Sequence, residues 1–185
     1  LGKVDAGARF PATAGSRPFA GRGIGIPTLD AVLGAFADVP VLIEVKEHAA
    51  CEAVRATLDR HAARGRAVVA SFRDDVVAYF RGTSYATGAA QGDVARLLRA
   101  ALTGRRVDPP YRAASVPPTY RGLPLPIGRF ARLLAPAGVP VHVWTVDDAR
   151  TAIRLWDTGV SGIVSNDPGT VLAALRGRAA RDAAR

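Results

Sequence analysis

A carboxylate and an ammonium group stand two residues apart in one apolar stretch, Val41-Leu42-Ile43-Glu44-Val45-Lys46. Side chains alternate across a β-strand, so Leu42, Glu44 and Lys46 would share one face. Burying these charges unpaired would be costly, and parallel α/β folds build their sites where strands end. Glu44 is therefore a candidate ligand for a hard cation, and Lys46 a candidate partner for phosphate. The alternative is a purely structural salt bridge between the two.

A second stretch, Val141-His142-Val143-Trp144-Thr145-Val146, places an aromatic ring near the end of another strand. Trp144 is either the wall of a substrate pocket or a core side chain. His142 lies two residues deeper, and we expect it to be a satisfied interior histidine. The other histidines, His48 and His61, have no partner at i,i+4 on their expected helix, which argues against a zinc site.

The composition excludes several classes of protein. One cysteine in 185 residues rules out an intrachain disulfide framework and a thiolate zinc cluster. The net charge is +9, but the arginines are scattered without interleaved aromatic side chains, so we expect no nucleic-acid partner. No apolar run reaches the roughly 20 residues of a membrane-spanning helix. The Gly21-Arg22-Gly23-Ile24-Gly25 stretch lacks the spacing of a nucleotide-binding loop.

The functional side chains belong to a repeating pattern of apolar strands and amphipathic helices. We expect six strands, at residues 39–45, 67–72, 83–87, 112–116, 139–146 and 160–165. We expect helices at about 49–64, 75–81, 93–102, 127–134 and 147–157, and a last one from Pro168. Residues 108–126 are rich in proline and indicate a weak strand and a long loop. This alternation predicts an α/β fold with a parallel sheet, and both a doubly wound sheet and a (β/α)8 barrel fit it.

Four segments, taken in order, resemble the glycerophosphodiester phosphodiesterase family. Asp5-Ala6-Gly7 and Ile26-Pro27-Thr28-Leu29-Asp30-Ala31-Val32-Leu33 resemble the family's "DAG … IPTLEEVL", and Leu42–Lys46 resembles its "IEIK" strand. Val69-Ala70-Ser71-Phe72 is similar to its "SF" strand. Val143–Asp147 with Gly159–Pro168 resembles its "VWTVN … GVDGIITDRP" ending. Each motif is weak alone, but their order and spacing span almost the whole chain.

The resemblance implies a (β/α)8 barrel that hydrolyses glycerophosphodiesters to an alcohol and sn-glycerol 3-phosphate with a divalent metal, Ca or Mg. It implies that Glu44 binds this metal, that Lys46 is catalytic through its contact with the phosphate, and that Trp144 lines the glycerol side of the substrate pocket. The family's His-Arg-Gly and Glu-x-Asp motifs, and the two catalytic histidines, have no counterpart here. The alternative is an inert barrel fragment that binds anionic headgroups or partners through its arginines.

The length of 185 residues agrees with the absence of these motifs, since a closed barrel takes about 250 residues. We therefore expect an incomplete barrel, about strands 3 to 8, over residues 1–176, followed by a basic C-terminal tail at 177–185. The chain begins Leu1-Gly2-Lys3 and holds no methionine, so we expect a processed N-terminus or a fragment of a longer protein. We also expect the chain as given to be poorly active. Its localisation, cytoplasmic or secreted, and its oligomeric state stay open.

Overall fold

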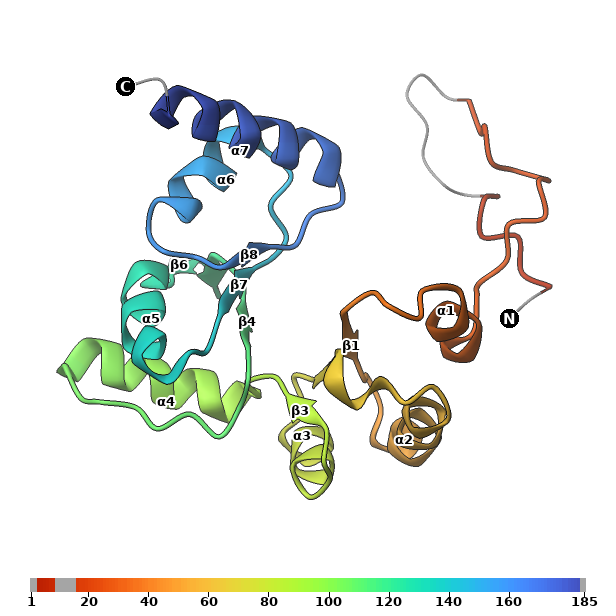
Figure 1. The fold of residues 1–185 in the computed structure, drawn as a ribbon, viewed down its shortest axis with the longest axis horizontal. Coiled ribbons are helices and arrows are strands. Elements are labelled where there is room, and N and C mark those ends of the chain that lie inside the picture. Colours follow the sequence, from red (N-terminus) through yellow and green to blue (C-terminus); the bar gives the residue numbers. More distant parts are fainter. Residues whose placement is uncertain (1–2, 9–15, 184–185) are drawn as a thin grey trace. The chain divides into compact units, whose positions relative to one another are not determined.

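Six strands that follow one another along the chain form the framework of the computed structural model (Figure 1), which describes residues 3–8 and 16–183. One sheet has the order β1 (Val41–Glu44), β2 (Ala67–Ala70) and β3 (Ala86–Thr87). The second has the order β4 (Ala114–Val116), β7 (Val141–Val143) and β8 (Gly162–Ile163). An isolated parallel bridge between Gly88 and Ala113 joins the two sheets.

The order of these strands decides between the two topologies that the sequence allowed. β2 pairs parallel with β3, and β7 pairs parallel with both β4 and β8. Neighbouring strands thus follow the chain without the reversal of order that defines a doubly wound sheet. This is the strand order of a (β/α) barrel, and within the described residues the sheet stays open, with no pairing between β8 and β1.

Helices separate most of the strands, and those that follow β1 lie at positions close to the expected ones. They are α1 (Leu29–Ala35), α2 (Cys51–Arg60), α3 (Asp74–Arg81), α4 (Gln91–Thr103), α5 (Ile127–Leu134), α6 (Ala149–Trp156) and α7 (Pro168–Ala183). Short 3-10 turns lie at His48–Ala50, Ala63–Gly65 and Ala135–Ala137. The proline-rich stretch contains an unexpected antiparallel hairpin, β5 (Thr119–Tyr120) and β6 (Leu123–Pro124). None of the helices in the described part of the chain has the length and apolarity to span a membrane.

The chain divides into two compact units, Leu1–Val41 with Glu52–Ala67, and Leu42–Cys51 with Val68–Arg185. In the first unit, the Thr28 hydroxyl accepts from the Ala31 N–H and caps α1. At the other end of that helix, the Arg66 guanidinium donates to the carbonyls of Leu33 and Phe36, and to that of Val39 just beyond. These contacts satisfy backbone carbonyls that the last turn of a helix leaves free.

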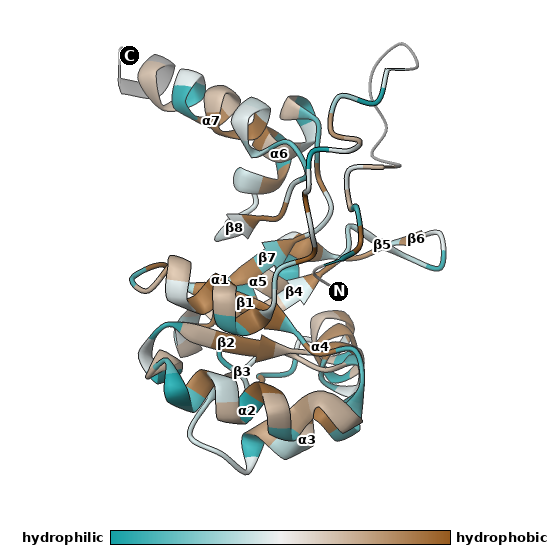
Figure 2. Cartoon of the chain, turned by 90° about the vertical axis from the view of Figure 1, so that its right-hand side faces the viewer, coloured by the Kyte–Doolittle hydropathy of each residue, from teal (hydrophilic) through white to brown (hydrophobic). Residues whose placement is uncertain are grey.

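The core of the second unit lies between its strands and the helices that cover one face of the sheet. Val141 and Val143 are buried in it with Phe130 and Leu134 of α5, whereas the intervening His142 is only half-buried. The same alternation holds in β2, which is apolar along its length (Figure 2). The opposite face of these strands carries their half-buried side chains, which are His142 in β7 and Val68 and Ala70 in β2.

The last helix crosses the boundary that we expected between the barrel and its tail. α7 runs without a break from Pro168 to Ala183. The segment expected as a basic tail is thus helical as far as Ala183, and a domain boundary at residue 177 stays a prediction.

Candidate functional site

Glu44 and Lys46 lie at the carboxyl end of β1, on the face that the alternation predicted. Leu42, Glu44 and Lys46 are exposed, while Ile43 is half-buried and Val45 is buried. Lys46 Nζ lies 2.5 Å from Glu44 Oε2, and the two side chains are 70% and 37% exposed. The salt bridge is present, and its exposure makes it weak and easily exchanged for another partner.

Two aromatic rings that follow β2 and β7 complete this group. Phe72 follows β2, and its ring meets that of Trp144, which follows β7, edge to face, with centroids 5.6 Å apart and an interplanar angle of 82°. Lys46 Nζ lies 6.0 Å from the Phe72 ring centroid. We call Glu44, Lys46, Phe72 and Trp144 the strand-end cluster. It brings together all three site residues that the sequence suggested.

Phe72 is the member that sequence reasoning missed. It is 54% exposed, which is unusual for a phenylalanine next to a buried strand. The preceding Ser71 fixes its backbone, because the Ser71 hydroxyl donates to the Val45 carbonyl (2.7 Å) and accepts from the Arg73 N–H (3.1 Å). The signal in the sequence was the position of Phe72 at the end of an apolar run.

A network of hydrogen bonds holds the loop that follows Trp144. The Asp147 carboxylate accepts from the Ser165 hydroxyl (3.0 Å), the Asn166 N–H (2.7 Å) and the Asn166 side-chain amide (3.1 Å). The bond from the Asn166 N–H is the main cause that lowers the pKa of Asp147 below its usual range. The loops that follow β7 and β8 are thereby tied together beside the strand-end cluster.

None of the chain's three histidines belongs to this cluster. His142 lies deeper on β7, with Nδ1 3.5 Å from the Ser115 hydroxyl, and burial lowers its pKa. It is neutral at pH 7 and half-buried, as expected of an interior histidine. The His48 ring contacts Tyr79 edge to face, and His61 is hydrogen-bonded to Asp30 in the first unit.

The described residues do not form a metal site by themselves. They contain no group of three or more histidine, cysteine, aspartate or glutamate side chains that could hold an ion. Calcium needs six to eight oxygen ligands, and magnesium needs octahedral oxygen coordination. Glu44 offers one carboxylate, and its partner in the structure is an ammonium group.

The strand-end cluster has the chemistry of a binding site for a small anion with a carbon skeleton. The Lys46 ammonium group supplies up to three hydrogen-bond donors and a positive charge. The two rings beside it offer apolar surface for a neighbouring carbon chain. The carboxyl ends of the strands are also where α/β barrels carry their active sites.

Comparison with known proteins identifies the family of the chain. The model of the glycerophosphoryl diester phosphodiesterase family matches residues 4–170. A probable glycerophosphodiester phosphodiesterase 2 from Mycobacterium tuberculosis is 29% identical over 154 residues, which cover 79% of this chain and 58% of the relative. The chain thus spans less than two thirds of that curated relative.

Solved structures agree in fold. A glycerophosphoryl diester phosphodiesterase domain from Mycobacterium tuberculosis superposes with a TM-score of 0.76 at 20% identity, over 95% of this chain and 72% of that one. A phosphodiesterase from Oleispira antarctica, solved with the product sn-glycerol-3-phosphate, gives a TM-score of 0.59 at 17% identity, over 82% and 62%. From the family match over most of its length, we conclude that the chain belongs to the glycerophosphoryl diester phosphodiesterase family.

Proposed function

We propose that this chain provides the phosphate- and glycerol-binding side of an enzyme that hydrolyses glycerophosphodiesters to an alcohol and sn-glycerol 3-phosphate. The observation that supports it most is the position of Lys46 beside the Phe72–Trp144 ring pair at the carboxyl ends of the strands. The family match and the relative solved with sn-glycerol-3-phosphate support the same substrate class.

Each residue of the cluster has a role that follows from its chemistry. Displacement at a phosphodiester builds negative charge on the phosphoryl oxygens, and the Lys46 ammonium stabilises that charge. Lys46 is free to leave Glu44 for the phosphate, because their exposed ion pair is weak. Trp144 and Phe72 pack against the carbon atoms of the glycerol group. Release of the alcohol also requires a proton donor, and no histidine lies in the cluster.

Glu44 is our proposal for one ligand of a divalent cation, Ca²⁺ or Mg²⁺. The described residues do not complete its coordination, so the roles above belong to the chain's own side chains. We further propose that the six strands correspond to strands 3 to 8 of an eight-stranded barrel. Residues 1–176 would form this domain, with 177–185 as a basic tail.

Binding of sn-glycerol 3-phosphate to the 185-residue chain tests the proposal directly. The chain has two tryptophans, so a Trp156→Phe background leaves Trp144 as the reporter of binding by fluorescence. We expect the product to change the Trp144 emission, and Lys46→Met to weaken binding by about tenfold or more, since a hydrogen bond to a charged group is lost. Lys3→Met is the matched control, because it removes the only other lysine.

Turnover of glycerophosphocholine by the same chain is expected to be slow, because the cluster holds neither an imidazole nor a second carboxylate. Equal affinity in the Lys46→Met and Lys3→Met variants would refute the role of Lys46. Rapid turnover that survives Lys46→Met would place the chemistry elsewhere. If both variants lose affinity for sn-glycerol 3-phosphate to the same small extent, binding depends on the net charge of the chain. That result would favour the alternative of an inert fragment that binds anions through its arginines.

A further inference from the structure

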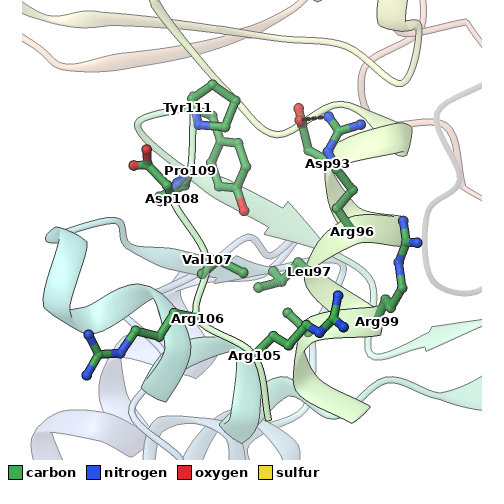
Figure 3. A pocket seen from close by; sticks show the side chains of 12 residues that line it. Asp93, Arg96, Leu97, Arg99, Arg105, Arg106, Val107, Asp108, Pro109 and Tyr111 are labelled. Atoms are coloured by element: carbon green, nitrogen blue, oxygen red, sulfur yellow. Dashed lines mark hydrogen bonds and ion pairs between the residues drawn. The ribbon is translucent and has the colours of Figure 1, made fainter. Parts of the chain in front are cut away.

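A second candidate site shares no residue with the strand-end cluster. A pocket of about 260 Å³ is lined by α4 and by residues 105–111, which belong to the connection from α4 to β4 (Figure 3). A segment that leads from a helix into a strand lies at the amino end of that strand in a parallel sheet. The part of the pocket made by this segment therefore lies toward the amino end of β4. None of the lining residues belongs to the strand-end cluster, and the proposed function does not use the pocket.

Arginines dominate the polar lining of this pocket. Arg96 and Arg99 come from α4, and Arg105 and Arg106 come from the segment after it. Figure 3 shows the Arg99 and Arg105 side chains on the same side of the pocket, while Arg106 points away from them. Within the described part of the chain, no ion pair joins Arg99 or Arg105 to a carboxylate. The two guanidinium groups are therefore available to a ligand.

A buried carboxylate fixes the third arginine. The Asp93 side chain is completely buried and accepts from Arg81, from Arg96 (2.5 Å) and from the Ala90 N–H (2.8 Å). Two guanidinium groups thus share one carboxylate, which leaves this group with a net positive charge. Because Arg96 is anchored at one end of the pocket, it loses little freedom when a ligand binds.

The remaining lining is apolar apart from one phenol and one carboxylate. Leu97 and Val107 lie at the base of the pocket, and the Tyr111 hydroxyl points into it (Figure 3). Tyr111 as a whole is only 4% exposed, and its hydroxyl makes no hydrogen bond within the described residues. Burial raises the pKa of Tyr111 to about 12, so the phenol keeps its proton and can donate. Besides Asp93, the lining contains one other negatively charged side chain, the exposed Asp108.

We propose that this pocket binds a phosphate monoester, with the guanidinium groups of Arg96, Arg99 and Arg105 on the phosphate oxygens and the organic group against Leu97 and Val107. Arg96, Arg99 and Arg105 bring three positive charges to the pocket. Asp108 offsets one of them, and Asp93 offsets part of another because it also pairs with Arg81, so the net charge exceeds +1. A phosphate monoester carries about −1.5 to −2 at pH 7, whereas a carboxylate or a phosphodiester carries −1. The guanidinium fork also matches phosphate oxygens in geometry.

Calorimetric titration with phenyl phosphate tests this proposal. The chain would carry Lys46→Met, so that the strand-end cluster does not contribute to the signal. We expect Arg99→Ala and Arg105→Ala each to weaken binding by about tenfold or more. Arg106→Ala is the matched control, because it removes the same charge next to Arg105 from a side chain that points away; its effect should stay below about threefold. Arg99 and Arg105 are exposed, so these variants keep the fold.

Two further ligands distinguish the source and the chemistry of the phosphate. Vesicles that contain phosphatidic acid, compared with neutral vesicles, would bind with the same arginine dependence if a lipid headgroup is the source; binding of phenyl phosphate alone would identify a soluble ester. Dimethyl phosphate, a monoanion, should bind more weakly than phenyl phosphate. Absence of binding to both phosphomonoesters at millimolar concentration would overturn the proposal. So would an equal loss of affinity in Arg105→Ala and Arg106→Ala, or equal affinity for the diester.

Discussion

Replacement of Asp93 by asparagine should destabilise the chain strongly, although the side chain keeps its size. The amide oxygen can still accept from the Ala90 N–H, but the charge that holds Arg81 and Arg96 is removed. Removal of one partner of a buried ion pair costs about 3 to 5 kcal/mol. The Arg81 and Arg96 side chains are 29% and 60% exposed, so water recovers part of this loss. We therefore expect a loss near the lower limit, about 3 kcal/mol.

Urea unfolding followed by far-UV circular dichroism measures this loss. For a chain of this length, about 3 kcal/mol corresponds to a fall in Tm of about 6 to 12 °C. Asp108→Asn is the matched control, since Asp108 is exposed and makes no ion pair within the described residues, and it should leave stability unchanged. If Asp93→Asn unfolds within about 0.5 kcal/mol of the unmodified chain, the buried carboxylate does not organise this region.

Three further predictions test other parts of the structure. Thr28→Ala removes the cap of α1 and should cost about 1 kcal/mol in urea unfolding; an unchanged midpoint would show that water replaces the cap. Burial lowers the pKa of His142 below about 6.5, so the unfolded chain binds more protons and stability falls as the pH drops through that range. His142→Asn should flatten this part of the curve of stability against pH, and an identical slope would contradict the assignment. A Cβ on Gly162 would lie 2.7 Å from His142 Cδ2, so Gly162→Ala should destabilise the chain and His142→Ala should relieve much of that cost in the double variant.

Local patterns in the sequence could predict where the strands lie and on which face of a strand the site residues stand. β-Branched runs mark β1, β2 and β7, and the period of two placed Glu44 and Lys46 on the exposed face. The order of the strands could not be predicted in this way, because both topologies share the same local pattern. It depends on pairings such as Ser115 with His142, which join distant parts of the chain.

The features that were missed have similar physical causes. Contact between Phe72 and Trp144 links two strand ends that are remote in sequence, so no local signal marks it. The hairpin at 119–124 was not predicted because the prolines around it indicated a loop. Its turn, Arg121-Gly122, has positive φ at both residues, as a tight hairpin requires, but lacks the usual Asn-Gly signature. The helix α4 begins at Gln91, two residues before the expected start, which places Asp93 in its first turn.

The sequential order of the strands also has a consequence for how the chain acquires its structure. Within each three-stranded sheet, every strand pairs with the framework strand that comes next along the chain, across a crossover connection that contains a helix. Parallel pairings form slowly, but a connection of one helix costs less entropy to close than a longer connection would. Translation proceeds from the amino terminus at about 5 to 20 residues per second. Each new strand of a sheet can therefore add to an edge that earlier residues supply, without waiting for residues that are made later.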